Sequence, residues 1–382
     1  MMKALCIHAG PQALQHIGRH GLAPSDVAVI PAAAGGPKGL ILGPLDRFVF
    51  GEWLAQSAQP VDLVGASIGA WRMATACLDN SLPAFERLEH DYIHQEYELP
   101  PGARRPTADA VSAQFGQNLQ AFFGGRVDTV LGHARYRLHI IAARGRHLLA
   151  REHRWATPLG YLGAFASNAL HRRALALWLD RVVFSTAAPG ALPFDVRDFR
   201  THQVALTPQN FMPALQASCS IPFVLRAVHD IAGAPRGAYW DGGITDYHLH
   251  LRYQAPIAIK NIADTALPAG VAGQNGLESA PGIVLYPHFQ HRVVPGWLDK
   301  GLPWRHRATP ALDRMVLLSP HPDWVRSLPG GKLPDRTDFT RYGTDTAARA
   351  RAWSTATAAA QQLADEWAQW LRRPDPARVQ PL

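Results

Sequence analysis

Two glycine-rich segments near the N-terminus each lie between a run that favours a β-strand and a run that favours an α-helix. The first, at residues 35–39 (G-G-P-K-G), follows a strand-like run at 26–30. The second, at residues 65–69 (G-A-S-I-G), follows a strand-like run at 61–64. Units of strand, tight turn and helix are the elements from which parallel sheets are built. The chain is therefore predicted to be an α/β protein with a mainly parallel central sheet.

The remaining sequence continues this alternation of strand and helix. Further strand-like runs at residues 4–8, 136–142, 182–185 and 203–206 are separated by helical segments. Such alternation is typical of a sheet with helices on both faces, so we expect a three-layer α/β/α sandwich. With 382 residues and 47% hydrophobic content, the chain can bury a large core, and we expect one catalytic domain.

Ser67 is the candidate nucleophile, because it lies at the centre of a G-x-S-x-G turn between a strand and a helix. Gly65 and Gly69 allow the sharp turn and keep side chains away from the serine. The helix expected at residues 70–76 directs the positive end of its dipole toward the site. These features predict an exposed hydroxyl that is favoured for attack.

The loop from Gly35 to Gly39 is the candidate oxyanion hole. Successive glycines at a strand-to-helix junction present backbone N–H groups that can bind a developing oxyanion or a phosphate. Because Pro37 has no N–H, Gly35 and Gly36 are the expected donors. A phosphate-binding P-loop is excluded, since Lys38 is not followed by serine or threonine and the G-x-x-x-x-G-K spacing is absent.

Asp241 is the candidate general base, and it is followed by Gly242 and Gly243. An Asp-Gly pair alone most often marks a turn. Here it ends a short aromatic strand-like run at 239–240, and the segment A-S-C-S-I-P at 217–222 precedes it. In combination with the other two motifs, this aspartate becomes a candidate catalytic residue.

These motifs, in this order, resemble the patatin-like phospholipase family. The resemblance rests on a glycine-rich loop ending in a basic residue and glycine, a G-x-S-x-G elbow, an Ala-Ser-x-x-Ile-Pro segment and a downstream Asp-Gly-Gly. It covers residues 26–247 and implies a patatin-like fold, with Ser67 as nucleophile and Asp241 as its base. It also implies an oxyanion hole at Gly35, Gly36, Lys38 and Gly39.

The implied reaction is hydrolysis of a lipid carboxylic ester through an acyl-enzyme on Ser67, with no cofactor and no metal. Asp241 accepts the serine proton, the loop N–H groups stabilise the tetrahedral oxyanion, and water releases the acyl group. An aspartate of ordinary pKa, about 3.9, is a poor base for a hydroxyl. We therefore expect burial beside Tyr239 and Trp240 to raise the pKa of Asp241.

The chain departs from the family pattern in two places. Ala34 stands where the family has the first glycine of the oxyanion loop, which is a mild change if Ala34 keeps a negative φ. After Gly243, residues 245–250 (T-D-Y-H-L-H) replace the Asn-x-Pro turn that is usual in the family. The support of the Asp241 loop and the choice of substrate are therefore open.

Three other functions stay open at this point. An α/β-hydrolase esterase would use a Ser-His-Asp triad, for which the candidates are His229, His248, His250, His288 and His291. That reading leaves the Gly35–Gly39 loop and the Asp241 motif unexplained. An acyltransferase would pass the same acyl group to an alcohol, whereas an inactive lipid-binding relative would lack Ser67 or Asp241. The histidine pairs lack the cysteine or carboxylate cluster that accompanies a metal site.

We divide the chain into a catalytic domain at residues 1–261 and a C-terminal extension at 262–382. Residues 344–372 are expected to form one long amphipathic helix, with an apolar stripe of Trp353, Ala356, Ala360, Leu363, Trp367 and Trp370. The stripe is expected to pack on the catalytic domain, with a dimer contact or a membrane contact as alternatives. Residues 82–125 and 158–179 are insertions that either pack on the domain or form a lid over Ser67.

A net charge of +8 limits the classes of partner. A positive surface attracts anionic lipid headgroups, so we expect a lipid ester substrate and transient contact with an anionic membrane surface. Basic residues are dispersed and no nucleic-acid module is recognisable, so no nucleic-acid partner is expected. Three scattered cysteines, with no recognisable secretory signal or membrane span, favour a cytoplasmic protein. The sequence does not fix the oligomeric state.

Overall fold

The structure is a computed structural model that describes residues 2–98, 100, 102, 106–254 and 282–382. Its centre is one sheet of eleven strands. In chain order these are β1 (Leu5–Ala9), β2 (Val27–Ala32), β3 (Val61–Ala66), β4 (Tyr136–Gly145), β5 (Leu179–Ser185), β6 (Thr201–Ala205), β7 (Val228–His229), β8 (Ala238–Asp241), β9 (Ile283–Pro287), β10 (Met315–Pro320) and β11 (Val379–Pro381). Each strand-like run expected from the sequence falls on one of them.

The sheet is mixed and has a parallel centre. Neighbouring strands follow the order β11-β1-β10-β9-β2-β3-β4-β5-β6, and β8 pairs with both β4 and β7. The strands from β10 to β4 in this order run parallel, whereas β1 and β5 pair antiparallel with their inner neighbours. The parallel strands β2, β3, β9 and β10 are buried along their whole length, as a sheet covered on both faces requires. The expected α/β class with a mainly parallel sheet is confirmed.

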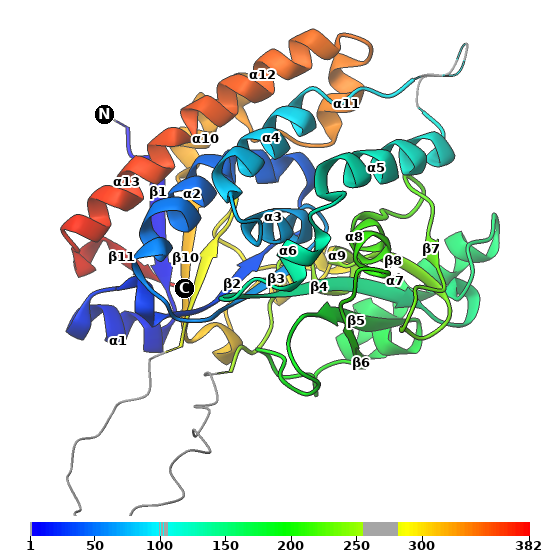
Figure 1. The fold of residues 1–382 in the computed structure, drawn as a ribbon, viewed down its shortest axis with the longest axis horizontal. Helices are drawn as coiled ribbons and strands as arrows, with labels where there is room; N and C mark the ends of the chain where they lie inside the picture. Colours follow the sequence, from blue (N-terminus) through cyan, green and yellow to red (C-terminus); the bar gives the residue numbers. More distant parts are fainter. Residues whose placement is uncertain (1, 99, 101, 103–105, 255–281) are drawn as a thin grey trace, which may run out of the picture.

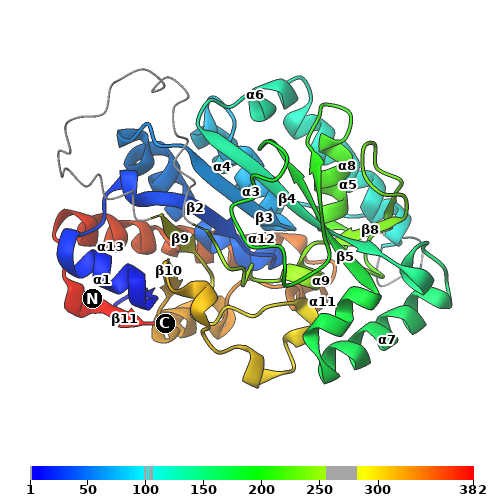
Figure 2. The same ribbon diagram turned by 90° about the horizontal axis from the view of Figure 1, so that it is seen from below.

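Helices cover both faces of this sheet. On one face lie α2 (Gly43–Phe48), α3 (Ile68–Ala76), α4 (Ser81–Ile93), α12 (Thr346–Ala359) and α13 (Gln361–Arg372) (Figure 1). Figure 2 shows α1 (Pro11–His20) and α7 (Ala156–Leu170) on the opposite side. The other helices are α5 (Ala108–Phe123), α6 (Val127–Leu131), α8 (Phe211–Cys219), α9 (Gly243–Asp246), α10 (Pro322–Ser327) and α11 (Thr337–Tyr342). This arrangement is compatible with a three-layer sandwich.

The register of β2 and β3 brings the two glycine-rich segments together. Ile30 lies opposite Leu63 and Ala32 opposite Gly65, so both strands end at the same edge of the sheet. The loop that follows β2 and the turn that follows β3 therefore begin side by side. In open α/β sheets, ligands bind in the crevice beyond the carboxyl ends of the strands, which is this edge.

The C-terminal region contributes strands to the central sheet, which differs from the expected extension packed on a complete domain. β9 lies between β2 and β10, and β10 lies between β9 and β1. Residues 282–382 therefore share one sheet and one core with the motif-bearing part. The expected boundary between residues 261 and 262 lies outside the described residues. These strands were not expected from the sequence, because each is a short apolar run among glycine- and proline-rich segments.

The expected single helix at residues 344–372 is two helices, α12 and α13, which meet at Ala360. All six residues of the predicted apolar stripe are buried, none more than 2% exposed. The ring of Trp367 packs edge-to-face on Trp53, with 6.1 Å between the ring centroids. The stripe packs within the chain, so it is not free to bind a membrane or a second subunit.

The two predicted insertions also fall on helices. Residues 82–125 carry α4 and α5, while residues 101 and 103–105 of their proline-rich break lie outside the described residues. Phe115 and Phe122 of α5 pack edge-to-face on Trp71 of α3, which joins α5 to the core. Residues 158–179 fall on α7 and the following 3₁₀ helix. No helix of the described ranges has both the length and the apolar character needed to cross a bilayer.

Candidate active site

Ser67 lies in the sharp turn between β3 and α3. Its backbone has φ 57° and ψ −131°, a conformation that a residue with a side chain rarely adopts. The turn packs closely on β2: a Cβ at position 69 would lie 1.9 Å from the carbonyl oxygen of Ala32, so only glycine fits there. Ser67 therefore has the strained geometry of a nucleophile elbow, at the N-terminus of a helix. Such strain at one serine makes that residue a candidate functional site.

Asp241 lies at the end of β8 and faces Ser67. The Ser67 hydroxyl donates a hydrogen bond of 2.6 Å to Oδ2 of Asp241. The N–H of Gly243 donates to Oδ1 of the same carboxylate at 2.7 Å. Ser67 and Asp241 are both buried, so the prediction of an exposed serine hydroxyl is wrong, and the serine contacts its potential base in a largely desolvated site.

The carboxylate of Asp241 differs from every other buried aspartate of the described residues in having no cationic partner. The other six each form an ion pair with an arginine or lysine: Asp46, Asp62, Asp180, Asp246, Asp299 and Asp338. Burial raises the pKa of Asp241 to about 6, although the hydrogen bonds from Ser67 and Gly243 and the charges of Arg336 and Lys300 act in the opposite direction. The expected rise in pKa is thus present, and Asp241 can exchange a proton near neutral pH.

Two glycines of the loop after β2 reach the same pocket. Gly35 and Gly36 line it together with Ser67 and Asp241. Gly36 has φ +57°, which only glycine adopts without strain. Neither of the two N–H groups donates a hydrogen bond to another described residue outside the helix that begins at Gly36, so both are open to a ligand.

Lys38 and Gly39, the other two residues predicted for the oxyanion hole, do not line the Ser67 pocket. The ammonium group of Lys38 lies 5.4 Å from the centroid of the Phe289 ring. Gly39 lines a neighbouring apolar pocket instead. Ala34 lines the Ser67 pocket and keeps a negative φ, so alanine in place of the first glycine does not strain the loop.

The glycines flanking the two catalytic candidates sit at close approaches of the backbone. A Cβ at any of these four positions would come within 3 Å of another atom, and they are Gly65, Gly69, Gly242 and Gly243. For Gly242 that atom is the carbonyl oxygen of Ile141 in β4, at 2.0 Å. The Asp-Gly-Gly motif is therefore needed for the Asp241 loop to pack on the central sheet.

Ser218, at the C-terminal end of α8, is a positioning residue that the sequence analysis did not identify. Its hydroxyl accepts a hydrogen bond from the N–H of Ser67 at 2.9 Å and donates one to the carbonyl of Ile141 at 2.7 Å. Its own carbonyl accepts from the N–H of Gly242. Ser218 thus ties the nucleophile turn, β4 and the Asp241 loop together. The A-S-C-S-I-P segment was noted in the sequence, but nothing local distinguishes this serine.

Residues from the C-terminal region complete the pocket. Trp297 and Arg336 line it, beside Ile221, Pro222 and Tyr247. The ammonium group of Lys300 lies 4.0 Å from the centroid of the Tyr247 ring. None of these C-terminal residues belongs to a motif, so they could not be identified from the sequence.

The candidate triad histidines lie away from the nucleophile. His248 and His288 are buried against each other, with ring centroids 4.4 Å apart. His248 accepts a hydrogen bond from the N–H of Val294, and His250 is bonded to the Val293 carbonyl and Thr309. Within the described ranges, no histidine is hydrogen-bonded to Ser67 or Asp241, and no group of three or more His, Cys, Asp or Glu side chains is arranged to hold a metal ion.

No family model, no curated protein and no solved structure matches this chain.

Proposed function

We propose that the protein is a serine acyl hydrolase that cleaves carboxylic esters of lipids with a Ser67–Asp241 dyad. The observation that carries the proposal is the 2.6 Å hydrogen bond between the Ser67 hydroxyl and the one buried aspartate of the described residues that lacks an ion-pair partner. A carboxylate neutralised by arginine is a weak base, whereas Asp241 keeps its affinity for a proton. The arrangement supports a dyad over a Ser-His-Asp triad.

In the proposed reaction, the Ser67 oxygen attacks the ester carbonyl while its proton passes to Asp241. The oxyanion of the tetrahedral intermediate is stabilised by the N–H groups of Gly35 and Gly36. The C–O bond to the alcohol then breaks, and Asp241 returns its proton to the leaving alkoxide. A water molecule attacks the acyl-enzyme, again giving its proton to Asp241, and Ser67 is released with the proton restored.

The family resemblance supports the same proposal. The strained elbow, the paired aspartate and the glycine loop have the order that the resemblance to patatin-like phospholipases implies. We therefore propose the patatin-like variant of the three-layer α/β/α architecture for this fold. Hydrolysis and transfer to an alcohol share the acyl-enzyme, so an acyltransferase is the second candidate activity.

An exposed apolar face next to the pocket favours lipid substrates. Leu159 and Leu162 of α7 are 60% and 64% exposed, and the exposed face also includes Trp155, Phe165 and Leu170. Buried Tyr161 of α7 contacts the exposed ring of Phe223, which directly follows Ile221 and Pro222 of the pocket wall. A large exposed apolar patch on a folded protein usually marks a binding surface.

Basic residues border this face. Arg154 lies over the ring of Trp155 at 5.0 Å, and Arg151 and Arg173 are exposed. A helix with leucines and aromatic residues on one side and arginines at its ends suits the interface of an anionic bilayer. We propose that α7 contacts the lipid surface from which the substrate is taken.

Labelling with a fluorophosphonate probe tests the dyad. We expect one adduct on Ser67, located by mass spectrometry, which is lost in Ser67→Ala and falls at least about 100-fold in rate in Asp241→Asn, in the range of general-base contributions. Ser319→Ala is the matched control, because Ser319 is a buried serine whose hydroxyl has no hydrogen bond in the described structure. Below pH 6 the labelling rate should fall about tenfold per pH unit, since protonated Asp241 cannot accept the serine proton.

Other outcomes of the labelling experiment would contradict the dyad. Full labelling of a folded Asp241→Asn variant, with loss on replacing a histidine, would assign the protein to the triad class. An absence of labelling together with no ester hydrolysis would favour the inactive lipid-binding relative. Addition of an alcohol acceptor distinguishes hydrolase from transferase by its products.

Vesicle sedimentation tests the lipid surface. We expect binding to vesicles of phosphatidylglycerol, weaker binding to phosphatidylcholine, and a loss of about tenfold in Leu162→Glu, which places a charge in the exposed apolar face of α7. Met2→Glu is the control, because Met2 is an exposed hydrophobic residue at the opposite edge of the sheet. Equal binding by both variants, or a shift to dimers through the same face, would contradict the lipid assignment.

A further inference from the structure

Three cations lie at or near the Ser67 pocket, and none of them forms an ion pair within the part of the chain that the structure describes. Arg336 lines the pocket, and Lys300 and Lys38 act electrostatically on it and on each other. Among the hydrogen bonds and ion pairs of the described residues, none involves the side chain of Lys38, Lys300 or Arg336. Most arginines around the core behave differently; Arg72 and Arg181, for example, are buried in ion pairs with Asp46 and Asp246.

Two of these cations share one aromatic wall of the pocket. The Lys300 ammonium group lies 4.0 Å from the Tyr247 ring centroid and 5.7 Å from that of Trp297. The Arg336 guanidinium lies 5.8 Å from the Trp297 centroid. Tyr247, Trp297 and Arg336 all line the pocket that contains Ser67 and Asp241. Lys300 and Arg336 therefore both lie near the ring of Trp297, which belongs to the wall of the candidate active site.

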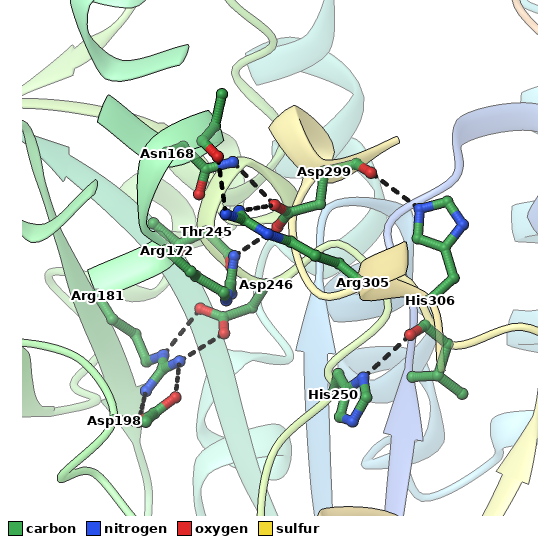
Figure 3. A network of polar contacts seen from close by, with 12 residues as sticks. Asn168, Arg172, Arg181, Asp198, Thr245, Asp246, His250, Asp299, Arg305 and His306 are labelled. Atoms are coloured by element: carbon green, nitrogen blue, oxygen red, sulfur yellow. Dashed lines mark hydrogen bonds and ion pairs between the residues drawn. The ribbon is translucent and has the colours of Figure 1, made fainter. Parts of the chain in front are cut away.

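A rigid network holds Lys300 at this place. Its neighbour Asp299 is fully buried and accepts hydrogen bonds from Asn168 at 2.8 Å, Arg172 at 2.6 Å and Arg305 at 2.8 Å (Figure 3). Arg172 also donates to the carbonyl of Thr245, two residues before Tyr247. The 3₁₀ turn Trp297–Asp299 is thereby fixed to α7 and to the loop that carries Tyr247. The backbone at Lys300 is therefore held in place by the hydrogen bonds of its neighbour Asp299.

Within the described residues the positive charges at this place are compensated only in part, since Asp335 acts on Lys38 and Asp241 on Lys300 without forming an ion pair. Partial desolvation and the nearby Arg336 and Lys38 lower the pKa of Lys300 to about 7, while Asp241 opposes this shift only in part. Crowding of cations in a pocket is unfavourable unless an anion occupies it. The ammonium and guanidinium groups supply the donors that bind phosphate or carboxylate strongly.

We propose that Lys300 and Arg336 form an anion-binding subsite that selects esters carrying a phosphate or carboxylate close to the scissile bond. The inference rests on the proposed hydrolase function and adds a chemical class of substrate to it. The subsite is separate from the arginines around α7, which border the lipid-facing surface. It is built from residues of the C-terminal region, outside the segment that carries the three motifs.

Two matched pairs of esters test the selectivity. In each pair only one ester is anionic: 4-nitrophenyl hydrogen glutarate against 4-nitrophenyl valerate, and 1-oleoylglycerol 3-phosphate against 1-oleoylglycerol. We expect kcat/KM to favour the anionic ester in at least one pair, which also shows whether the anion lies on the acyl or the alcohol side. Lys300→Gln and Arg336→Gln should each lower this preference about tenfold, the scale of one charge-assisted hydrogen bond. Arg19→Gln, an equal change of charge on exposed α1, should not alter it.

A binding measurement separates the subsite from the chemistry. Calorimetric titration of the Ser67→Ala variant with hexyl phosphate should detect binding. The affinity should fall about tenfold when Lys300→Gln or Arg336→Gln is added to Ser67→Ala, and it should not change when Arg19→Gln is added. Inorganic phosphate serves as the comparison, and equal affinity for it would identify a site for the free anion and overturn the substrate assignment.

The two proposals fail in different ways. Hydrolysis of all esters without preference, with hexyl phosphate affinity unchanged by Lys300→Gln and Arg336→Gln, would overturn the subsite and keep the hydrolase. Binding of hexyl phosphate through Lys300 and Arg336, with no ester cleaved and no labelling of Ser67, would keep the subsite as an anion site and refute the hydrolase.

Discussion

Asp241 and Asp299 are two buried aspartates near one pocket, and their surroundings are opposite. Asp299 accepts hydrogen bonds from two arginines and an asparagine, and it forms ion pairs with both arginines (Figure 3). From the described residues Asp241 accepts hydrogen bonds only from a hydroxyl and one backbone N–H, and burial raises its pKa to about 6. A buried carboxylate with guanidinium partners is a structural anchor, whereas one without them stays a proton acceptor. The partners, not the burial, separate the two roles.

The first prediction is that Asp299→Asn strongly destabilises the protein. The asparagine would leave Arg172 and Arg305, which are 27% and 15% exposed, without their counter-charge. Breaking a buried ion pair costs about 3–5 kcal/mol, and the partial exposure of these arginines favours the lower end of that range. Chemical denaturation measures the loss. An unchanged free energy of unfolding would show that Asp299 is not an anchor, and the comparison would then fail.

The second prediction is a smaller effect of opposite sign for Asp241→Asn. Folding raises the pKa of Asp241 from 3.8 to about 6, so the folded protein favours the protonated carboxyl group. The stabilisation from this preference is fully present below pH 3.8 and is lost as the pH rises through about 6. At pH 7 the neutral asparagine avoids this loss. The free energy of unfolding of the Asp241→Asn variant should therefore be higher than that of the wild type by up to about 3 kcal/mol. The gain should vanish near pH 4. Destabilisation by Asp241→Asn at pH 7 would indicate that Asp241 is structural, like Asp299.

The turn at Ser67, the glycine loop and seven strands could be predicted because each is coded by neighbouring residues. Glycines at a strand-to-helix junction and continuous apolar runs are local signals. Ser218 and Lys300 could not be predicted in the same way, because their roles depend on contacts with Ser67 and Tyr247, which are distant in the sequence. The paired motifs predicted that Ser67 and Asp241 would meet, but not that Asp241 would lack a cation.

The C-terminal part was predicted least well, for physical reasons that differ between its elements. β9 and β10 are short and buried, and a short apolar run fits a strand or a helix equally well. In the region 344–372 the apolar stripe was predicted correctly, but the break at Ala360 was not, since alanine favours helix and carries no stop signal. Tertiary packing overrides the local preference there.

The position of β9 between β2 and β10 has a consequence for how the protein reaches its native state. About 250 residues separate Ala32, at the end of β2, from Ile283, at the start of β9. The strand that leads into the glycine loop therefore gains its second neighbour only after most of the chain has left the ribosome. Pairings over such a separation form slowly, and an unpaired apolar strand edge invites aggregation meanwhile. Recombinant production should benefit from slow synthesis at low temperature. The concentration of incompletely folded chains is then lower, so the unpaired edge of β2 meets fewer other chains before β9 pairs with it.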